Sequence, residues 1–461
     1  MAQTAAPSVS ISAMRKVTLA AVAGTVIEWF DFAMYGFMAP TLATTFFPSH
    51  DRLIGLLETF AVFAVAFALR PVGGAFFGLL GDRIGRKRIL ALTVLIMSAS
   101  TAAVGLLPSY ATAGIWAAVL LTVARCAQGF SAGGEYAGAV TYLIEHSPKE
   151  RRASYGSLLP AATFGSFALA ALVAYLLTAA LPEATLNAWG WRVAFLVAAP
   201  MGYVAFYIRR RLDESPAFQE VVKEGGAPRT SLATTVREQW SRMLRLAGFI
   251  ALTGVSFYTF STYMTTFLRE VVGLPSDSVL LSNVLALVAA TVMSPLIGRV
   301  CDRVGRRMTM MAAAVLLGCL AVPAYVLAGG GGIAHALLAQ ILLALGAVTA
   351  NVVTAVLLCE MFPTRMRYTA SAVTYNIAYA IFGGTAPFVA TLLIATTGSH
   401  LAPAVYIVVI AVIALIAAIT IPETSRLALS RDTADQQALE ADEPAALPAS
   451  RAGAPHLPTV G

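Results

Sequence analysis

Charged side chains are scarce in this chain of 461 residues. Asp, Glu, Lys and Arg make up 12% of the sequence, about half their share in an ordinary soluble domain. Hydrophobic residues make up 58%, and the mean hydropathy is +0.76. A soluble protein of this length cannot hide so much apolar surface, so the composition predicts a protein whose solvent is lipid.

Cysteine is scarce too, and the residue groupings that enzymes need are absent from the sequence. The four cysteines are scattered in or beside apolar segments, with no metal-ligand spacing: Cys126, Cys301, Cys319 and Cys359. We therefore expect no disulfide, no metal and no other cofactor. No nucleophile–base pair or phosphate-binding loop appears either, which argues against an enzyme.

Long apolar segments recur along the chain, each near the roughly 20 residues needed to cross the hydrocarbon core of a bilayer. Their number predicts an all-α integral membrane protein with twelve transmembrane helices in two bundles of six. The segments are 17–38, 53–78, 88–107, 112–144, 155–181, 191–208, 246–270, 278–298, 308–328, 333–361, 368–397 and 402–421.

Basic residues indicate the orientation. Of 31 Lys and Arg, Arg52, Arg192 and Arg269 fall at ends assigned to the outside, and Arg70 and Arg125 lie inside spans. The other 26 lie in loops and tails that we assign to the cytoplasm, as the positive-inside rule requires. The net charge of +7 thus reflects orientation and contact with anionic headgroups, not nucleic-acid binding. Both termini are predicted to be cytoplasmic.

One short pattern occurs twice, 220 residues apart. G-x-x-x-D-R-x-G-R-[KR] begins at Gly78 and again at Gly298. A second pattern, E-x-x-P-x-x-x-R, begins at Glu145 and at Glu360, an offset of 215. Each copy lies between two apolar segments. The chain is therefore predicted to be two copies of one membrane-embedded unit, as in transporters that rock one half against the other.

The repeat divides the chain into five parts. The first apolar run contains Glu28 and Asp31 and has no clear cleavage site, so we interpret it as an uncleaved span rather than a signal peptide. The residues after Pro422 are too poor in large apolar side chains to fold alone. We predict an N-terminal segment 1–16, a bundle 17–208, a cytoplasmic connector 209–245, a second bundle 246–421 and a disordered tail 422–461.

Several ionisable residues fall well inside the spans of the first half, among them Glu28, Asp31, Arg70, Arg125 and Glu135. A charge at mid-bilayer costs about 2.5–3.5 kcal/mol on insertion scales, so such residues need a reason to be there. From the helical rise of 1.5 Å per residue, Glu28 and Arg125 lie near the midplane. We expect Glu28 and Asp31 to meet Arg125, and Arg70 to meet Glu135.

These charges have a structural and a functional interpretation. They can be ion pairs that only hold helices together. However, three carboxylates face two arginines, and a buried carboxylate without a cationic partner favours its protonated form. We therefore name Glu28, Asp31 and Glu135 as candidates for proton coupling.

Candidate substrate contacts surround these charges. Aromatic faces at Trp29, Phe30 and Tyr35 can hold a cationic amine by cation–π contact, and Arg125 can hold a carboxylate, with Gln128 on the same helix face. The second half lacks matching charges and offers Tyr258, Tyr263 and Asn351. A role in helix packing is the alternative for each of these three. Glycines inside the spans have the same two interpretations, close packing or hinges.

The repeated motifs predict cytoplasmic gates. Asp82 and Asp302 can accept backbone N–H groups at a helix start, and the arginines of the motifs can hold Glu145 and Glu360. Such contacts would close the cytoplasmic side and break when it opens. The proposed gating residues are Arg70, Asp82, Arg83, Arg86, Glu145, Arg152, Asp302, Arg303, Arg306, Glu360 and Arg367.

The doubled motif resembles the signature of the major facilitator superfamily. Within it, Glu28–Phe32, Arg70–Gly74 and Gln128–Tyr136 resemble the metabolite:proton symporter family, as do Gly190–Arg192 and Glu214–Phe218. The likeness is greatest to proton-coupled carriers of proline and glycine betaine, through Leu79–Asp82, Ile96–Thr101 and Gly105–Tyr110. Some of those carriers have a C-terminal coiled coil. The tail here contains no heptads.

The resemblance implies a monomeric carrier in a bacterial cytoplasmic membrane that imports a small solute with protons by alternating access. A zwitterionic osmoprotectant such as proline or glycine betaine is our first expectation. A proton symporter for an organic acid of the 2-oxoglutarate, citrate or shikimate type would use the same arginine and is the alternative. A membrane sensor that has lost transport is a third, against which the complete set of intramembrane charges argues.

Overall fold

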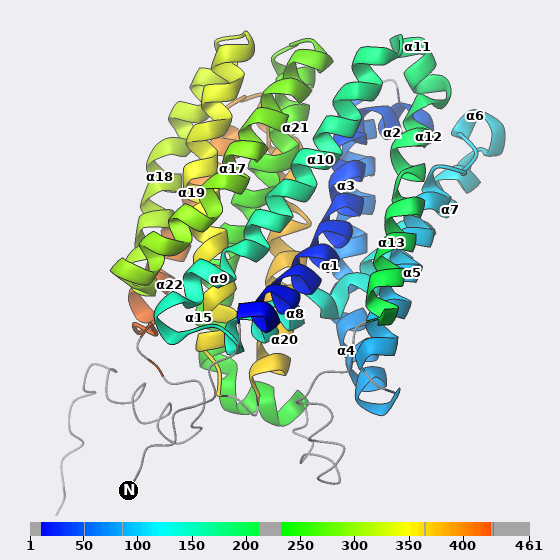
Figure 1. The fold of residues 1–461 in the computed structure, drawn as a ribbon. Helices are drawn as coiled ribbons and strands as arrows, with labels where there is room; N and C mark the ends of the chain where they lie inside the picture. The colour runs from blue at the N-terminus through cyan, green and yellow to red at the C-terminus, as the bar shows by residue number, and fades with distance from the viewer. Residues whose placement is uncertain are drawn as a thin grey trace, which may run out of the picture.

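The computed structural model describes residues 11–49, 51–84, 86–211, 232–363, 366–425 and 427, and these residues form helices and no strands. The long helices run side by side along one direction, with short helices capping the upper end in the view of Figure 1. Within the described ranges, nine helical segments are long and apolar enough to cross a membrane. The all-α membrane fold is therefore confirmed.

Six helical segments make up the first half, and several of them are interrupted. Short elements connect them: α2 (Ala39–Phe46), α6 (Tyr110–Ala113), η2 (Lys149–Arg151), α9 (Arg152–Gly156), α11 (Glu183–Thr185) and η3 (Leu186–Gly190). The segments are α1 (Ile11–Phe37), α3 (Arg52–Ala68) with α4 (Arg70–Ile84), α5 (Arg86–Val104), α7 (Ile115–Ser131) with η1 (Ala132–Gly134) and α8 (Glu135–Glu145), α10 (Leu158–Ala180), and α12 (Trp191–Leu196) with α13 (Ala198–Arg211).

The second half also has six segments, so that each of the twelve predicted spans corresponds to one helical segment. They are α15 (Leu232–Tyr258) with η4 (Thr259–Tyr263), α16 (Met264–Thr266) and η5 (Phe267–Val271), then α17 (Ser276–Val304), α18 (Arg306–Gly329), α19 (Ile333–Glu360), α20 (Arg367–Ala378) with η6 (Tyr379–Gly383) and α21 (Ala386–Thr397), and α22 (Ala402–Thr420).

The two halves meet along a long seam. Helix α10 packs along α17, α1 contacts η4, and α20 packs against α4 and α8. In Figure 1, α10 runs beside α17 along much of their length. Functional side chains on α1, α15 and η6 therefore project into a boundary that both halves share.

The outer surface of the bundle is apolar, as lipid contact requires. On α22, for example, Val409, Val412 and Ile416 are exposed, whereas Ala411 and Ala414 are buried. Large apolar side chains facing outward and small ones facing neighbouring helices are the arrangement expected in a bilayer, where close helix approach supplies the packing energy.

Three glycines fasten the second predicted span to the fourth. A Cβ atom at Gly129 would overlap the carbonyl of Ala66, and one at Gly73 would overlap the carbonyl of Phe130. A Cβ atom at Gly133 would overlap the backbone where α4 begins. Only glycine permits backbones to approach this closely. At these positions the packing interpretation of the glycines is the one that the structure supports.

Helical irregularities occur where the sequence pattern predicts continuous helices. The fourth span is interrupted by the 3-10 turn η1, and the seventh and eleventh contain the π-helical turns η4, η5 and η6. Residues 232–245, predicted as connector, belong to α15, and residues 212–231 lie outside the described part. π-Helical turns often occur at functional sites, and η4 and η6 both border the site described next.

Candidate functional site

The intramembrane carboxylate of Glu28 is paired with Arg70. Arg70 Nη2 lies 2.8 Å from Glu28 Oε1, and both side chains are buried. The sequence analysis instead paired Arg70 with Glu135 and gave Glu28 to Arg125, which is wrong. Because removing one partner from a buried ion pair costs about 3–5 kcal/mol, this pair is a strong constraint between α1 and α4.

The break in the fourth span explains the difference. The predicted stripe of Arg125, Gln128 and Glu135 requires one continuous helix, but η1 ends α7 after Ser131 and Glu135 begins α8. Arg70 is the first residue of α4 and its Nη2 lies 3.5 Å from the carbonyl of Ala132. The Arg70 guanidinium therefore reaches past η1 to Glu28 on α1. Glu28 lies one helical turn before Asp31.

Asp31 is the carboxylate that remains. Both of its oxygens are buried, and neither accepts a hydrogen bond from the described residues. It interacts electrostatically with Arg125, but the two side chains form no ion pair at bonding distance. Asp31 is thus the surplus carboxylate that the count of charges predicted.

Arg125 has bonding capacity to spare. Its Nη1 donates to Gln128 Oε1 at 2.5 Å, and Gln128 Nε2 in turn donates to Thr101 Oγ1. Its Nε and Nη2 are buried without a hydrogen-bond acceptor in the described structure. A guanidinium held by one neutral amide, with two donors left, is suited to receive an anionic group.

Aromatic rings separate and surround the two arginines. The guanidinium carbon of Arg70 lies 5.3 Å from the ring centre of Phe32, and that of Arg125 lies 5.2 Å from the same ring centre. Arg125 also lies 4.2 Å from the ring centre of Tyr35. The ring of Tyr35 therefore contacts the Arg125 guanidinium. The Tyr35 hydroxyl donates to the carbonyl of Thr59 at 2.9 Å.

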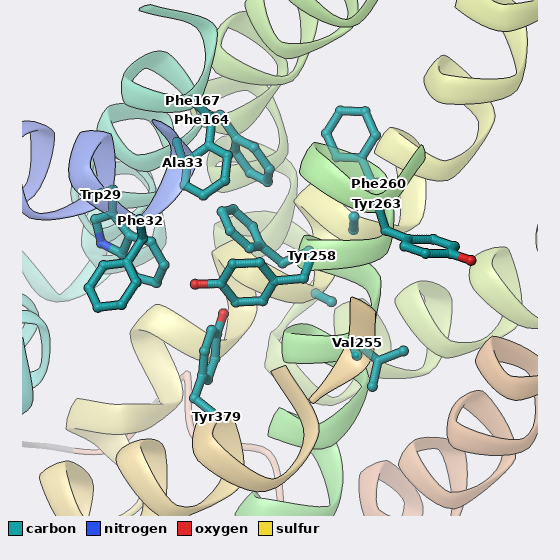
Figure 2. Packing of buried hydrophobic residues seen from close by; sticks show 14 of the residues in the cluster. Trp29, Phe32, Ala33, Phe164, Phe167, Val255, Tyr258, Phe260, Tyr263 and Tyr379 are labelled. Carbon is teal, nitrogen blue, oxygen red and sulfur yellow. The ribbon is translucent and has the colours of Figure 1, made fainter. Parts of the chain in front are cut away.

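The second half adds aromatic groups to the same place. Phe257 packs edge-on against Trp29 with ring centres 5.4 Å apart, and Tyr379 lies 6.3 Å from Trp29. Figure 2 shows the hydroxyl of Tyr258 pointing toward the side of Trp29 and Phe32, with the hydroxyl of Tyr379 close to it in this view. The hydroxyl of Tyr258 is buried without a hydrogen-bond partner among the described residues.

Three of the predicted contacts have other surroundings. Asn351 accepts the hydroxyl of Tyr379 at 3.2 Å and so positions that ring. Phe30 is buried but makes no ring contact with the described aromatic residues around Trp29. The hydroxyl of Tyr263 points away from Trp29 in Figure 2.

These residues form an occluded cluster at the seam. We call them the central cluster, and none of its members is more than 1% exposed. Its donors and acceptors without partners include groups on Asp31, Arg125, Tyr258 and Trp29. The central cluster consists of Glu28, Trp29, Asp31, Phe32, Arg70, Arg125, Gln128, Tyr258 and Tyr379.

The inner end of the seam, which we predicted to be cytoplasmic, is closed by charges that cross between the halves. Asp302 accepts the backbone N–H groups of Ala153 and Ser154 at 2.9 and 2.8 Å. Arg367 Nη1 lies 2.7 Å from Glu145 Oε1, and Arg152 Nη1 lies 3.5 Å from Glu360 Oε1. The carboxylate of the second motif thus meets a helix start in the opposite half, in the manner the motif predicts.

Glu360 is the centre of this closure. Arg306 donates to both of its oxygens at 3.1 Å, in the bidentate geometry that makes such pairs strong. Arg303 is exposed, and the side chains of Asp82, Arg83 and Arg86 lie outside the described residues. We call the described contacts the inner latch, formed by Glu145, Arg152, Asp302, Arg306, Glu360 and Arg367.

The sequence analysis missed the residues just after the last span. Glu423 accepts the backbone N–H groups of Arg306 and Arg307 at 2.9 and 3.0 Å, and Thr424 donates to Glu360 at 2.7 Å. Arg152 donates to the carbonyl of Leu427 at 2.8 Å, across the seam. The predicted tail therefore begins with ordered residues that complete the inner latch.

Glu423 stays ionised in this position. Partial burial acts to raise the pKa of its carboxyl, but the N–H groups of Arg306, Ser425 and Arg307 outweigh burial and hold the pKa below its usual value. A carboxyl with a depressed pKa stabilises the folded state above its unfolded pKa and loses that contribution only as the pH falls through the folded value. The inner latch therefore keeps this contact at neutral pH.

Glu360→Gln is expected to weaken the inner latch, because Arg306 and Arg152 both lose a buried anion. Removing one partner of a buried pair costs about 3–5 kcal/mol, and about 1.4 kcal/mol is tenfold in an equilibrium. The native thiol of Cys359 is buried beside these charges. With the other three cysteines replaced by serine, maleimide labelling of Cys359 from the inner side should accelerate about tenfold or more.

Glu145→Gln is the matched control, because the side chain of Glu145 is 37% exposed whereas that of Glu360 is fully buried. An ion pair with an exposed partner contributes about 0.2–1 kcal/mol, so its removal should change the rate less than about fivefold. Equal rates for the two variants would show that burial does not set the strength of this latch.

Comparison with known proteins agrees with this architecture. The family model described as the major facilitator superfamily matches residues 21–373 and 282–448. The proline/betaine transporter of Escherichia coli K12 is 38% identical over 432 residues, which cover 91% of this chain and 86% of that protein. The glycine betaine/proline/ectoine/pipecolic acid transporter OusA of Dickeya dadantii is 37% identical, over 91% of this chain and 85% of its own length.

Solved structures show the same fold at low sequence identity. The proton:xylose symporter XylE bound to 6-bromo-6-deoxy-D-glucose superposes with a TM-score of 0.72 at 18% identity, covering 92% of this chain and 99% of that one. The partially occluded, inward-open form of XylE from E. coli gives 0.67 at 20% identity, covering 91% and 100%. With the family match spanning nearly the whole helical region, the chain belongs to the major facilitator superfamily and is a membrane transporter, not an enzyme.

Proposed function

We propose that the protein is a proton-coupled symporter that imports a small zwitterion such as proline or glycine betaine. The observation that carries this proposal is the central cluster, in which buried donors and acceptors lack partners at the seam between the halves. Each buried polar group without a partner costs about 1–3 kcal/mol. An occupant with both an anionic and a cationic end would satisfy the cluster.

The anionic end is assigned to Arg125. Its Nε and Nη2 and the hydroxyl of Tyr258 are buried donors without acceptors in the described structure. One donor group belongs to each half. A solute carboxylate bound to both donors would therefore connect the two halves. A carrier that changes conformation only when it is loaded requires such a connection.

The cationic end is assigned to the aromatic faces of Trp29, Phe257 and Tyr379. These rings meet at the seam, with Trp29 at 5.4 Å from Phe257 and 6.3 Å from Tyr379. Rings of this kind hold secondary or quaternary ammonium groups by cation–π contact. Of the three rings first proposed for this role, only Trp29 is kept, because Tyr35 already contacts Arg125 and Phe30 makes no ring contact with the described aromatic residues around Trp29.

The proton is assigned to Asp31. Its carboxylate is buried, accepts no hydrogen bond in the described structure and shares the field of Arg125 with the solute carboxylate. When a solute anion binds Arg125, Asp31 loses the main cation that favours its charge, and proton uptake at Asp31 becomes easier. Solute and proton thereby promote each other's binding, which is thermodynamic coupling.

The proposed cycle uses the two bundles 17–208 and 246–421 as the moving parts. The inner latch breaks to release solute and proton into the cytoplasm and re-forms as the carrier resets. The distribution of Lys and Arg supports a cytoplasmic location for both termini of this inner-membrane protein, and a single chain contains the whole central cluster. A monomer therefore suffices for transport.

Uptake into proteoliposomes tests the proposed function. Labelled proline or glycine betaine should accumulate when an inside-alkaline pH gradient is imposed, and a protonophore should abolish the accumulation. Excess 2-oxoglutarate should not compete, because a dicarboxylate offers no cation to the aromatic rings. Competition by organic acids together with absence of zwitterion uptake would favour the organic-acid alternative, and no uptake of either class would favour a sensor.

Arg125→Gln is expected to weaken solute binding about 10- to 150-fold, because a hydrogen bond to a charged group contributes about 1.5–3 kcal/mol. Binding of labelled solute to the purified protein measures this effect. Arg237→Gln, which changes an exposed arginine of α15, should leave affinity unchanged. Wild-type affinity in Arg125→Gln would place the carboxylate site elsewhere.

A further inference from the structure

A second set of charges crosses the seam at the end opposite the inner latch. Arg52, the first residue of α3, donates from Nη2 to Glu270 Oε1 at 3.0 Å, and its Nε lies beside the other carboxylate oxygen. Glu270 belongs to η5 of the second half, where Arg269 Nε also lies 3.2 Å from Oε1. Arg52 follows α2, which lies at the upper end in Figure 1, whereas α8 and α9 of the inner latch lie at the lower end.

The burial of these partners is unequal. The side chain of Glu270 is 3% exposed, whereas that of Arg52 is 61% exposed. A carboxylate that is buried so fully needs cations, since an ion loses its hydration on burial. Arg269 comes from the same helix and moves with it, so Arg52 is the partner whose contact must break when the halves separate.

The helix that carries Glu270 is built to bend. Between Thr259 and Val271 it passes through two π-helical turns, η4 and η5, separated by the three residues of α16. π-Helical turns weaken the regular i to i−4 ladder and allow kinks. The same helix bears Tyr258 of the central cluster at the end of α15, so a bend here links the outer end of the seam to the site.

A small cavity at the same seam is lined in part by Arg269, the other partner of Glu270. Thr41 of the first half lines it together with Thr265, Thr266 and Arg269 of the second. The hydroxyl of Thr266 is buried and has no hydrogen-bond partner among the described residues. Further in, Gly36 touches Thr262 so closely that a Cβ atom at Gly36 would come within 2.7 Å of the threonine methyl. The seam is therefore closed at two successive levels above the central cluster.

We propose that the Arg52–Glu270 ion pair is the outer latch of this transporter. It holds the outer end of the bending helix α15–η5 against α3 while the solute is occluded. When it breaks, η4 and η5 let that helix tilt away, and the cavity lined by Thr41 and Thr266 opens into the entry path. This role holds for whichever solute is carried.

The test measures which end of the seam is open, in the absence of solute. Thr41→Cys in a variant with all four native cysteines replaced by serine reports the outer side, through a membrane-impermeant maleimide added outside. Cys359 as the single cysteine reports the inner side. Loss of an ion pair with an exposed partner should shift the outward-open population about two- to fivefold. Arg52→Gln and Glu270→Gln should each raise outer labelling by that factor and lower inner labelling.

Two controls separate a latch from general loosening. Asp277→Asn removes an exposed carboxylate near the start of α17 that forms no ion pair with the described residues, and it should change neither rate. The double variant Arg52→Gln with Glu270→Gln should label no faster than either single variant, because both remove the same interaction. Unchanged outer labelling, additive effects, or a rise at both ends together would each overturn the proposal. Because no solute is present, these results do not depend on the proposed function.

Discussion

Asp31→Asn is expected to abolish proton-driven accumulation of solute while leaving exchange of solute across the membrane. Asparagine keeps the size of the side chain but cannot take up or release a proton. Net uptake requires the empty carrier to return deprotonated, whereas exchange returns it loaded. Uphill uptake and counterflow, measured in the same proteoliposomes, should therefore differ, with the first at background and the second near the wild-type rate.

Glu28→Gln is the comparison that makes this result specific. Glu28 is ion-paired to Arg70 at 2.8 Å, so its neutralisation leaves a buried arginine without its anion, at a cost of about 3–5 kcal/mol. We expect that variant to yield less folded protein and to lose uptake and exchange together. If Asp31→Asn still accumulates solute at the wild-type rate, Asp31 is structural and Glu135 is the next candidate for the proton site.

Gly129→Ala is expected to prevent correct folding. Its new Cβ atom would occupy the position of the Ala66 carbonyl, so α3 and α7 would have to separate along their contact. Overpacking a tight interior commonly costs about 1–3 kcal/mol and sometimes more, and backbone atoms offer no rotamer by which to escape. The yield of monodisperse protein in detergent, and its thermal unfolding midpoint, should both fall well below wild type.

Gly165→Ala, on α10, provides the matched control. There the added Cβ atom meets only the side chain of Thr291, with its methyl at 3.7 Å and its hydroxyl oxygen at 3.8 Å, which is ordinary van der Waals contact. That variant should fold normally and unfold at or slightly above the wild-type temperature, since alanine favours a helix more than glycine does. Normal folding of Gly129→Ala would show that the two helices tolerate separation.

Sequence reasoning located the twelve spans because they follow from strong local signals. Twenty apolar residues span a bilayer, and charges inside them must face the interior. Counting charges also predicted one carboxylate without a partner, and the structure shows that it is Asp31. The pairing of Arg70 was wrong because helical periodicity gives the face of a residue but not its height relative to other helices. That height depends on the turn at Ala132–Gly134.

Contacts made by residues outside the apolar spans and the repeated motifs could not be predicted from the sequence. Glu423 follows the last apolar span in a polar stretch, where a carboxylate normally indicates a solvated tail, yet it binds the backbone of Arg306 and Arg307. The ion pair of Arg52 and Glu270 joins residues 218 positions apart, and neither belongs to a repeated motif. Such contacts depend on how distant segments of the chain pack together, which no local pattern encodes.

The glycine contacts of the first half have a consequence for how this transporter can diversify. The helices that hold Arg70 and Arg125 are joined backbone to backbone at Gly73, Gly129 and Gly133, so almost any substitution there disturbs the charges themselves. The rings contributed by Phe257, Tyr258 and Tyr379 come from helices with π-helical turns, whose geometry can adjust. New substrate preferences should therefore arise by mutation in the second half. A directed-evolution library confined to that half would change substrate selectivity and leave the residues proposed for proton coupling unchanged.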